Sequence, residues 1–248
     1  MKTTNHYIPS TLLTTNNSKT IKGEKFGWKT YILYMSPHKQ NSTGKSICPM
    51  ATAGCAAACL YTAGHGSMST VKRGRMNKTE FFLADRKAFL RKLYIEVSQL
   101  ELLHRLEETK FAVRLNGTSD ISWEKFLMEE TGLNIFESFP TVQFYDYTKN
   151  HLRFTRPFPK NYRVIFSRSE TNNDMAFALL EKGVNVAIVF DRIPEKFNGY
   201  DVINGDESDL RFLDGKSVIV GLKYKNITGG GADNKAAFTS GFAIRLAA

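Results

Sequence analysis

The sequence of 248 residues has only three cysteines, and all of them lie between positions 48 and 59. They are too few and too clustered for the disulfide framework of a small secreted protein. No apolar run approaches the roughly 20 residues that a transmembrane helix needs. The first residues, MKTTNHYIPSTLL, also lack the apolar block of a signal peptide. These absences predict a cytoplasmic protein without a membrane partner.

Acidic residues are nearly absent from the first third of the chain. Residues 1–79 hold eleven Lys and Arg residues but one acid, Glu24, so the whole net charge of +10 lies there. Such a region is either a solvated basic surface or a patch for a polyanion such as nucleic acid. The second interpretation predicts these nucleic-acid contacts: Lys72, Arg73, Arg75 and Lys78.

The apolar pattern predicts a loosely ordered basic arm at 1–26 and a single domain at 27–248. A first strand at 29–35 precedes a long cysteine-containing loop at 37–78, with a short helix in its Ala-rich part. A long amphipathic helix is then expected from Asn77 to about Glu108. Further strands are predicted at 111–115, 141–147, 162–166, 184–190, 201–203 and 217–222, and further helices at 122–130 and 174–182.

Alternation of strands and helices predicts an α/β fold with a mainly parallel sheet. The strand VNVAIVF lacks polar alternation, which is typical of a strand covered on both faces. The sheet is expected to form a complete or partial α/β barrel, with an open doubly wound sheet as the alternative. No G-x-G-x-x-G follows the first strand and no G-x-x-x-x-G-K-[ST] occurs, so the usual dinucleotide and nucleoside-triphosphate sites have no support.

Polar residues follow five consecutive predicted strands. In parallel α/β folds the site lies at the carboxyl ends of the strands, so these residues are expected to share a pocket. The alternative is that they are ordinary loop residues and helix caps. The predicted site residues are Asn116, Ser119, Asp120, Asp146, Lys149, Ser167, Glu170, Asp206 and Asp209.

The segment CPMATAGCAAACLYTAGHG carries the strongest chemical signal. Cys48, Cys55 and Cys59 are separated by six and then three residues, among glycines that let the backbone fold around them. Three interpretations stay open. The thiolates hold an iron–sulfur cluster with one open iron, they bind a structural zinc ion together with His65, or they are reduced thiols packed among alanines.

Several segments together resemble the gene product 88 family of phages and prophages. They include CPMATAGCAAACLYTAGHG, VRLNGTSDISWEKF, FPTVQFYDYTKN, NYRVIFSRSE and GDESDLRFLDGKSVIVGLKYK. The likeness runs from about residue 25 to the C-terminus. It implies a phage-type protein in the cytoplasm of an infected or lysogenic bacterial host, and it implies no particular activity.

The order of a first strand, a three-cysteine loop and alternating strands and helices is also similar to radical SAM enzymes. That likeness implies a partial barrel in which Cys48, Cys55 and Cys59 hold a four-iron cluster and S-adenosylmethionine binds its open iron. The spacing here is wider than the C-x-x-x-C-x-x-C of those enzymes, and Asn116-Gly117-Thr118 stands in place of Gly-Gly-Glu. We therefore expect an iron–sulfur protein, with nucleic-acid binding and a structural zinc module as the alternatives.

Overall fold

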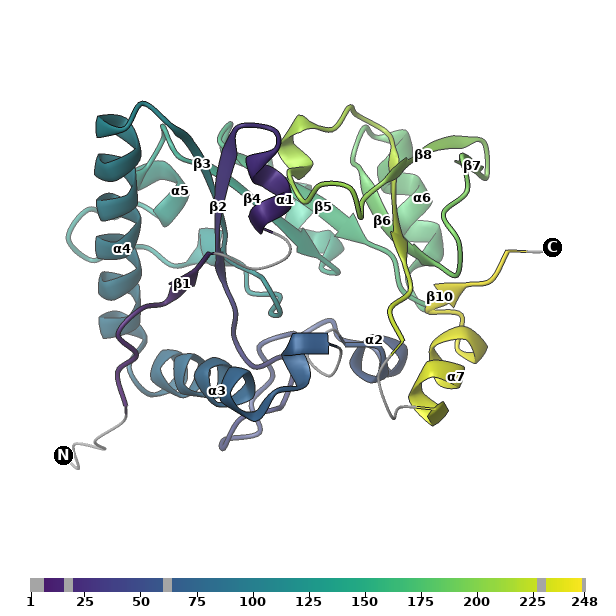
Figure 1. Ribbon diagram of the computed structural model, residues 1–248, viewed down its shortest axis with the longest axis horizontal. Coiled ribbons are helices and arrows are strands. Elements are labelled where there is room, and N and C mark those ends of the chain that lie inside the picture. Colours follow the sequence, from purple (N-terminus) through teal and green to yellow (C-terminus); the bar gives the residue numbers. More distant parts are fainter. Residues whose placement is uncertain (1–6, 16–19, 60–63, 227–230, 247–248) are drawn as a thin grey trace.

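The centre of the molecule is a ten-stranded, mainly parallel sheet, seen in the computed structural model in Figure 1. The structure describes residues 7–15, 20–59, 64–226 and 231–246. The strands are β1 (Leu13–Thr14), β2 (Trp28–Leu33), β3 (Lys110–Arg114), β4 (Gln143–Thr148), β5 (Tyr162–Ser167), β6 (Val186–Phe190), β7 (Lys196–Phe197), β8 (Tyr200–Asn204), β9 (Ile219–Lys223) and β10 (Ala243–Ile244). The predicted α/β class with a parallel sheet is confirmed.

The strand order is β1-β2-β3-β4-β5-β6-β9-β8-β7, with β10 added beside β6. Only β1–β2 and β7–β8 are antiparallel pairs among the described strands. The two ends of this order, β1 and β7, are not paired with each other in the described part of the chain, so the sheet does not close into a complete barrel. Six neighbouring parallel strands, from β2 to β9, nevertheless follow one another in chain order.

One face of the sheet is covered by helices. The α-helices are α1 (Thr20–Glu24), α2 (Ala53–Ala57), α3 (Ser69–Ala84), α4 (Arg86–Leu106), α5 (Ile135–Ser138), α6 (Asn173–Glu181) and α7 (Gly231–Thr239). Side chains of α3, α4 and α5 form one core cluster with β2, β3 and β4, and α6 packs with β5, β6 and β9 in a second cluster. Phe111 and Val113 point to this face, as the two-residue period of a strand requires.

The opposite face of the sheet carries smaller and more polar side chains. Ile165, Ala187 and Val220 form a small apolar cluster there. The turn η5 (Arg211–Leu213) covers this face near the amino ends of the strands, since the Phe212 ring packs 4.7 Å from Trp28 and 5.7 Å from Tyr145 between ring centroids. A pocket forms at the opposite end, where the carboxyl ends of the strands lie.

The helix predicted from Asn77 to about Glu108 is two helices, α3 and α4, separated at Asp85. The Asp85 backbone has φ −141° and ψ 82°, outside the helical region, and its side chain accepts a hydrogen bond from the Ala88 N–H at 2.9 Å. Asp is a favoured N-cap because its carboxylate satisfies a free amide of the first turn. The chain therefore turns at Asp85, and α3 lies across the end of α4 (Figure 1).

The helix predicted at 122–130 is wrong, since only the turn η3 (Trp123–Lys125) forms there. The Trp123 side chain is buried in the main core, and its indole N–H donates to the Asn116 side chain at 3.2 Å. Arg153 holds Glu124 through two hydrogen bonds of 2.8 and 2.7 Å. These tertiary contacts favour a turn followed by extended backbone at Phe126 over the helix that the local pattern indicates.

The carboxyl ends of the parallel strands point toward the segment 37–78 and α7, at the bottom of Figure 1. The loop predicted over 37–78 is wrong from Ser69 onward, where α3 begins. The predicted short helix in the Ala-rich part of the loop is confirmed as α2, which contacts α7 from the other end of the chain. Two short elements, β1 and α1, lie within the predicted N-terminal arm. Within the described residues, no helix is both long and apolar enough to cross a membrane.

Candidate functional site

A pocket of about 520 Å³ lies at the carboxyl ends of the strands, between the sheet and the loop 37–78. We call it the cysteine pocket, because its lining includes Cys48, Cys55 and Cys59. Seven of the nine predicted site residues also line it: Asn116, Ser119, Asp120, Lys149, Ser167, Asp206 and Asp209. The position at the strand ends is the one that parallel α/β folds generally use for ligands.

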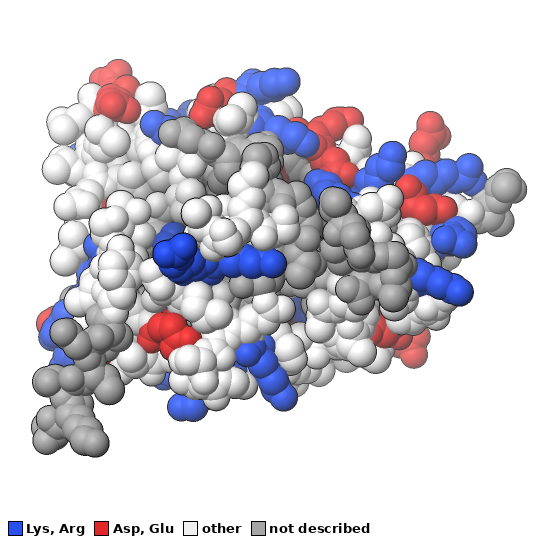
Figure 2. Space-filling view, turned by 60° about the horizontal axis from the view of Figure 1, so that its bottom comes forward, with Lys and Arg blue, Asp and Glu red and all other residues white. Residues whose placement is uncertain are grey.

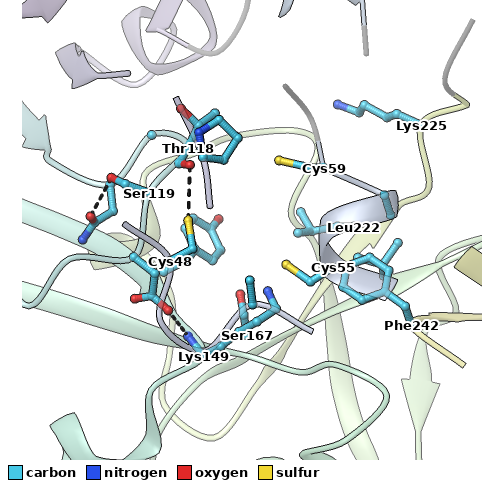
Figure 3. Close-up of a pocket in the computed structure, with 18 of the residues that line it drawn as sticks. Cys48, Cys55, Cys59, Thr118, Ser119, Lys149, Ser167, Leu222, Lys225 and Phe242 are labelled. Carbon is cyan, nitrogen blue, oxygen red and sulfur yellow. Dashed lines mark hydrogen bonds between the residues drawn. The ribbon is translucent and has the colours of Figure 1, made fainter. Parts of the chain in front are cut away.

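The three cysteines come from one loop and face one another across the pocket. Figure 3 shows the Cys55 and Cys59 sulfur atoms on the α2 side and Cys48 opposite them. Among the described residues, none of the three forms a disulfide. In the described part of the chain, no three His, Cys, Asp or Glu side chains come close enough to hold a single metal ion. The thiols therefore share a cavity without converging on one point.

Cys48 is the most enclosed of the three thiols. The backbone N–H of His38 donates to its Sγ at 3.2 Å, and the Sγ lies 3.8 Å from the Thr118 carbonyl oxygen as a donor (Figure 3). Burial raises the pKa of Cys48 to about 12, because a thiolate loses hydration there. Without a ligand, Cys48 is a protonated thiol at neutral pH.

Cys55 is positioned by the capping of α2. Thr52 is the N-cap, and its side chain accepts from the Cys55 N–H at 3.1 Å. Glu170 then holds this first turn from the loop after β5, accepting from the Gly54 N–H at 2.7 Å and from the Thr52 hydroxyl at 2.9 Å. Glu170 does not line the cysteine pocket. Its role in the structure is to fix the helix that carries Cys55.

Lys149 is the cation closest to the thiols. It follows β4 and lies with Cys55 and Ser167 in Figure 3. Burial by itself lowers the pKa of Lys149, but the nearby Cys55 and Asp120 outweigh it and hold the pKa above its ordinary value. The Asp120 carboxylate also accepts from the backbone N–H of Lys149 at 2.8 Å and from the Thr148 hydroxyl at 2.6 Å. The Lys149 side chain therefore places a positive charge beside Cys55 in the pocket.

Asn116 organises the loop after β3. Its side-chain oxygen accepts from the Ser119 hydroxyl at 2.9 Å and from the Ile121 N–H at 2.9 Å, in addition to the Trp123 indole. Its amide donates to the Ile121 carbonyl oxygen at 3.0 Å. Asn116 and Ser119 thus shape the pocket wall through bonds to each other and to the loop.

Asp146 does not line the cysteine pocket and has no exposure to solvent. Its carboxylate accepts from the Asn116 N–H at 2.7 Å and from the Tyr162 hydroxyl at 3.0 Å. Burial raises its pKa to about 7, although Arg114, the Asn116 N–H and Arg153 act in the opposite direction. Asp146 supports the pocket from beneath, through the backbone of Asn116.

Arg114 and Asp209 form the deepest charged part of the pocket. Arg114 Nη1 donates to Asp209 Oδ2 at 2.8 Å, and both residues are more than nine-tenths buried. The guanidinium group lies 4.6 Å from the Tyr147 ring centroid. Sequence reasoning found Asp209 but missed Arg114, since a single Arg at the end of the apolar strand FAVRL reads as a surface residue. The signal available was its place two residues before Asn116, in a strand predicted from an apolar run.

Two of the predicted nucleic-acid contacts are held by the fold. Lys78 donates to the Leu12 carbonyl oxygen at 2.6 Å, and burial lowers its pKa to about 8. Arg75 stacks on Tyr34 at 5.0 Å from the ring centroid. Arg73 is exposed and Lys72 half-buried on α3. Among the residues coloured in Figure 2, Lys and Arg are scattered among uncharged residues on this side of the molecule. Nucleic-acid binding stays a prediction.

The predicted zinc ligand His65 lies on η2 (Gly64–Ser67), and its side chain falls outside the described part of the structure.

Comparison with known proteins gives one match. A search of curated proteins and a search of solved structures each found none, so the fainter likeness to radical SAM enzymes gains no support. The family model for gene product 88 matches residues 11–245, which is nearly the whole chain and includes every residue of the cysteine pocket. The protein therefore belongs to the gene product 88 family.

Proposed function

We propose that this protein binds an iron–sulfur cluster on Cys48, Cys55 and Cys59, in the pocket at the carboxyl ends of the strands. One observation carries the proposal: three cysteines from a single loop line the same cavity. Cys48 and Cys55 each also touch an apolar cluster, Cys48 the main core and Cys55 the cluster around Phe242. All three nevertheless line one pocket together with charged and hydroxyl side chains.

Three thiolates are the protein ligands of a cluster that keeps one iron open. A structural zinc ion needs four ligands within about 2.3 Å of one point. Among the described residues, no three His, Cys, Asp or Glu side chains form a group that could hold a metal ion. A cluster on three thiolates leaves one iron open. S-adenosylmethionine or another small molecule with nitrogen and oxygen ligands would fit this open position, as in a partial-barrel enzyme.

The surroundings support cluster binding chemically. Lys149 offsets the negative charge of the thiolates, and the His38 N–H already donates to the Cys48 sulfur. Hydrogen bonds to ligand sulfur atoms tune the reduction potential of a cluster. Because burial raises the pKa of Cys48 to about 12, ligation must displace its proton, and assembly becomes faster as pH rises. Asp120 and Ser167 line the same pocket and would orient a bound small molecule.

Anaerobic purification, or reconstitution with iron and sulfide, tests the proposal. We expect a brown protein with about four iron and four sulfide ions per chain. Single Cys48→Ser, Cys55→Ser and Cys59→Ser variants should each lose most of this iron. Thr43→Ala, an exposed change in the same loop, is the matched control and should retain it. A colourless, iron-free protein would refute the cluster, and stoichiometric zinc that needs the same cysteines would establish the zinc alternative.

A further inference from the structure

The cysteine pocket has a charged part that comes from β3 and the loop after β8 rather than from the cysteine loop, namely Arg114 with Asp209. Arg114 is the last residue of β3, and the chain runs from it through Asn116 and Thr118 toward Cys48. The Asp120 N–H then donates to the Ile47 carbonyl oxygen at 3.0 Å, next to Cys48 in the loop. We call the side of the pocket formed by the strands, with Arg114, its floor, and the side formed by the cysteine loop its roof.

Arg114 has more donors than its protein partners use. A guanidinium group offers five N–H donors, and one of them reaches Asp209. Its Nε has no hydrogen-bond partner among the described residues but is itself enclosed, so a ligand in the pocket would use the Nη donors. An unused donor on a buried cation is costly, and a planar fork of donors is suited to a carboxylate or phosphate.

Cations outnumber acids around the pocket. Its lining includes five of them: Lys22, Arg114, Lys149, Lys223 and Lys225. The lining acids are three, Asp120, Asp206 and Asp209, and each is engaged by protein donors. Lys22 donates to the Asp206 carbonyl oxygen and Lys225 lies 3.3 Å from its carboxylate, so two lysines gather at this rim. The excess positive charge attracts an anion into the pocket.

The walls between floor and roof are apolar and aromatic. Val189, Leu222 and Phe242 line them, together with the Tyr147 ring on which Arg114 lies. The pocket volume of about 520 Å³ is within the range of small-molecule sites. A ligand for this shape has an apolar or aromatic body and one anionic group.

We propose that the cysteine pocket binds a small organic anion, with its carboxylate or phosphate on Arg114 and its apolar body extending toward the cysteines. This inference rests on the proposed function in one respect, because it names the substrate class of the same pocket. The anion site itself is built from β3, β4 and the loop after β8, so it exists whether or not a cluster is bound. The ligand would span from the charged floor to the reactive roof.

Calorimetric titration of the iron-free chain tests the anion site with matched probes. The carboxylate arm compares 3-phenylpropionate with 3-phenylpropanol, and the phosphate arm compares phenyl phosphate with phenol. We expect one acid to bind at least about tenfold more tightly than its uncharged analogue, as a charge-assisted hydrogen bond implies. The arm that discriminates identifies the anionic group.

The double variant Arg114→Gln/Asp209→Asn removes both charges while keeping hydrogen-bonding side chains, so no buried charge is left alone. It should bind acid and uncharged analogue equally, with an unchanged circular dichroism spectrum. Lys196→Gln, on an exposed lysine far from the pocket lining, is the control and should keep the discrimination. Equal binding of acid and analogue by the wild type, failure of both acids to bind, or discrimination retained in the double variant would overturn the inference. Iron analysis reports on the cluster separately, so the two proposals fail independently.

Discussion

Asp146 is a carboxyl group without solvent contact, held by the Asn116 N–H and the Tyr162 hydroxyl. Burial raises its pKa to about 7, so the folded protein retains a proton that the unfolded chain releases near pH 4. The stability that this proton contributes is complete below about pH 4 and is lost as the pH rises through about 7.

The variant Asp146→Asn removes this titration. We expect the free energy of unfolding of the wild type, relative to the variant, to fall by more than about 1 kcal/mol between pH 4 and pH 8. Urea unfolding at several pH values measures the difference. Asp201→Asn, at an exposed carboxylate paired with Lys196, should show a flat difference over the same range. Parallel profiles for wild type and Asp146→Asn would show that Asp146 is ionised throughout.

The polar residues after the strands predict where the site lies, but they do not predict which of them line the pocket and which support it from outside. Asp120 and Asp146 look alike in the sequence, yet one lines the pocket and the other lies beneath it. Glu170 follows β5 as predicted and serves as a brace for α2. Register and side-chain direction decide these outcomes, and both depend on contacts between strands far apart in the chain.

At the scale of elements, α2 is a five-residue helix whose place depends on close packing at Gly54. A Cβ atom at this position would lie 2.8 Å from Glu170 Oε1 and 2.8 Å from Phe242 Cβ. Gly54→Ala should therefore destabilise the protein by about 1–3 kcal/mol and shift Cys55. Thermal unfolding and iron content after reconstitution measure the two effects.

Gly74 provides the matched control for this prediction. It lies within α3, and a Cβ there has nothing within 4 Å. Gly74→Ala should leave the iron content unchanged and stabilise the protein by about 0.5–1 kcal/mol, because Ala favours the helix. Equal effects of the two substitutions would mean that α2 does not depend on its contact with Glu170.

The long buried strands and α6 are predictable because their local pattern agrees with their tertiary role. VNVAIVF becomes β6, and the helix expected at 174–182 is α6, ending before Gly183 at a φ of +89°. The break at Asp85 and the turn at Trp123 are not predictable in this way. At Asp85 a capping carboxylate overrides the helical pattern, and its bond to the Ala88 N–H forms only once the backbone has turned. At Trp123 a buried indole overrides it, and the partner of that indole, Asn116, lies outside the predicted helix.

Over the whole molecule, a segment of the first third and the C-terminal segment lie side by side at the carboxyl ends of the strands. The segment 37–78 supplies the three cysteines, and its helix α2 contacts α7, at the bottom of Figure 1. Cys55 packs against the small cluster of Ala237, Phe242 and Ala243. Sequence alone does not predict this meeting, because nearly two hundred residues separate Cys55 from Phe242.

Phe242→Ala should open this wall and expose Cys55. We expect the rate of Cys55 alkylation by iodoacetamide, measured by mass spectrometry on the iron-free chain, to rise several-fold, while stability falls by about 3 kcal/mol. Phe238→Ala is the matched control, since Phe238 packs on Tyr224 in the same segment but does not line the pocket. It should lose stability without a faster reaction at Cys55. If both variants accelerate alkylation equally, general loosening of the segment rather than the Phe242 side chain governs access to the thiols. Faster alkylation in Phe242→Ala alone would show that the C-terminal segment limits access of the reagent to Cys55, because the Phe242 ring lines the pocket and the Phe238 ring does not.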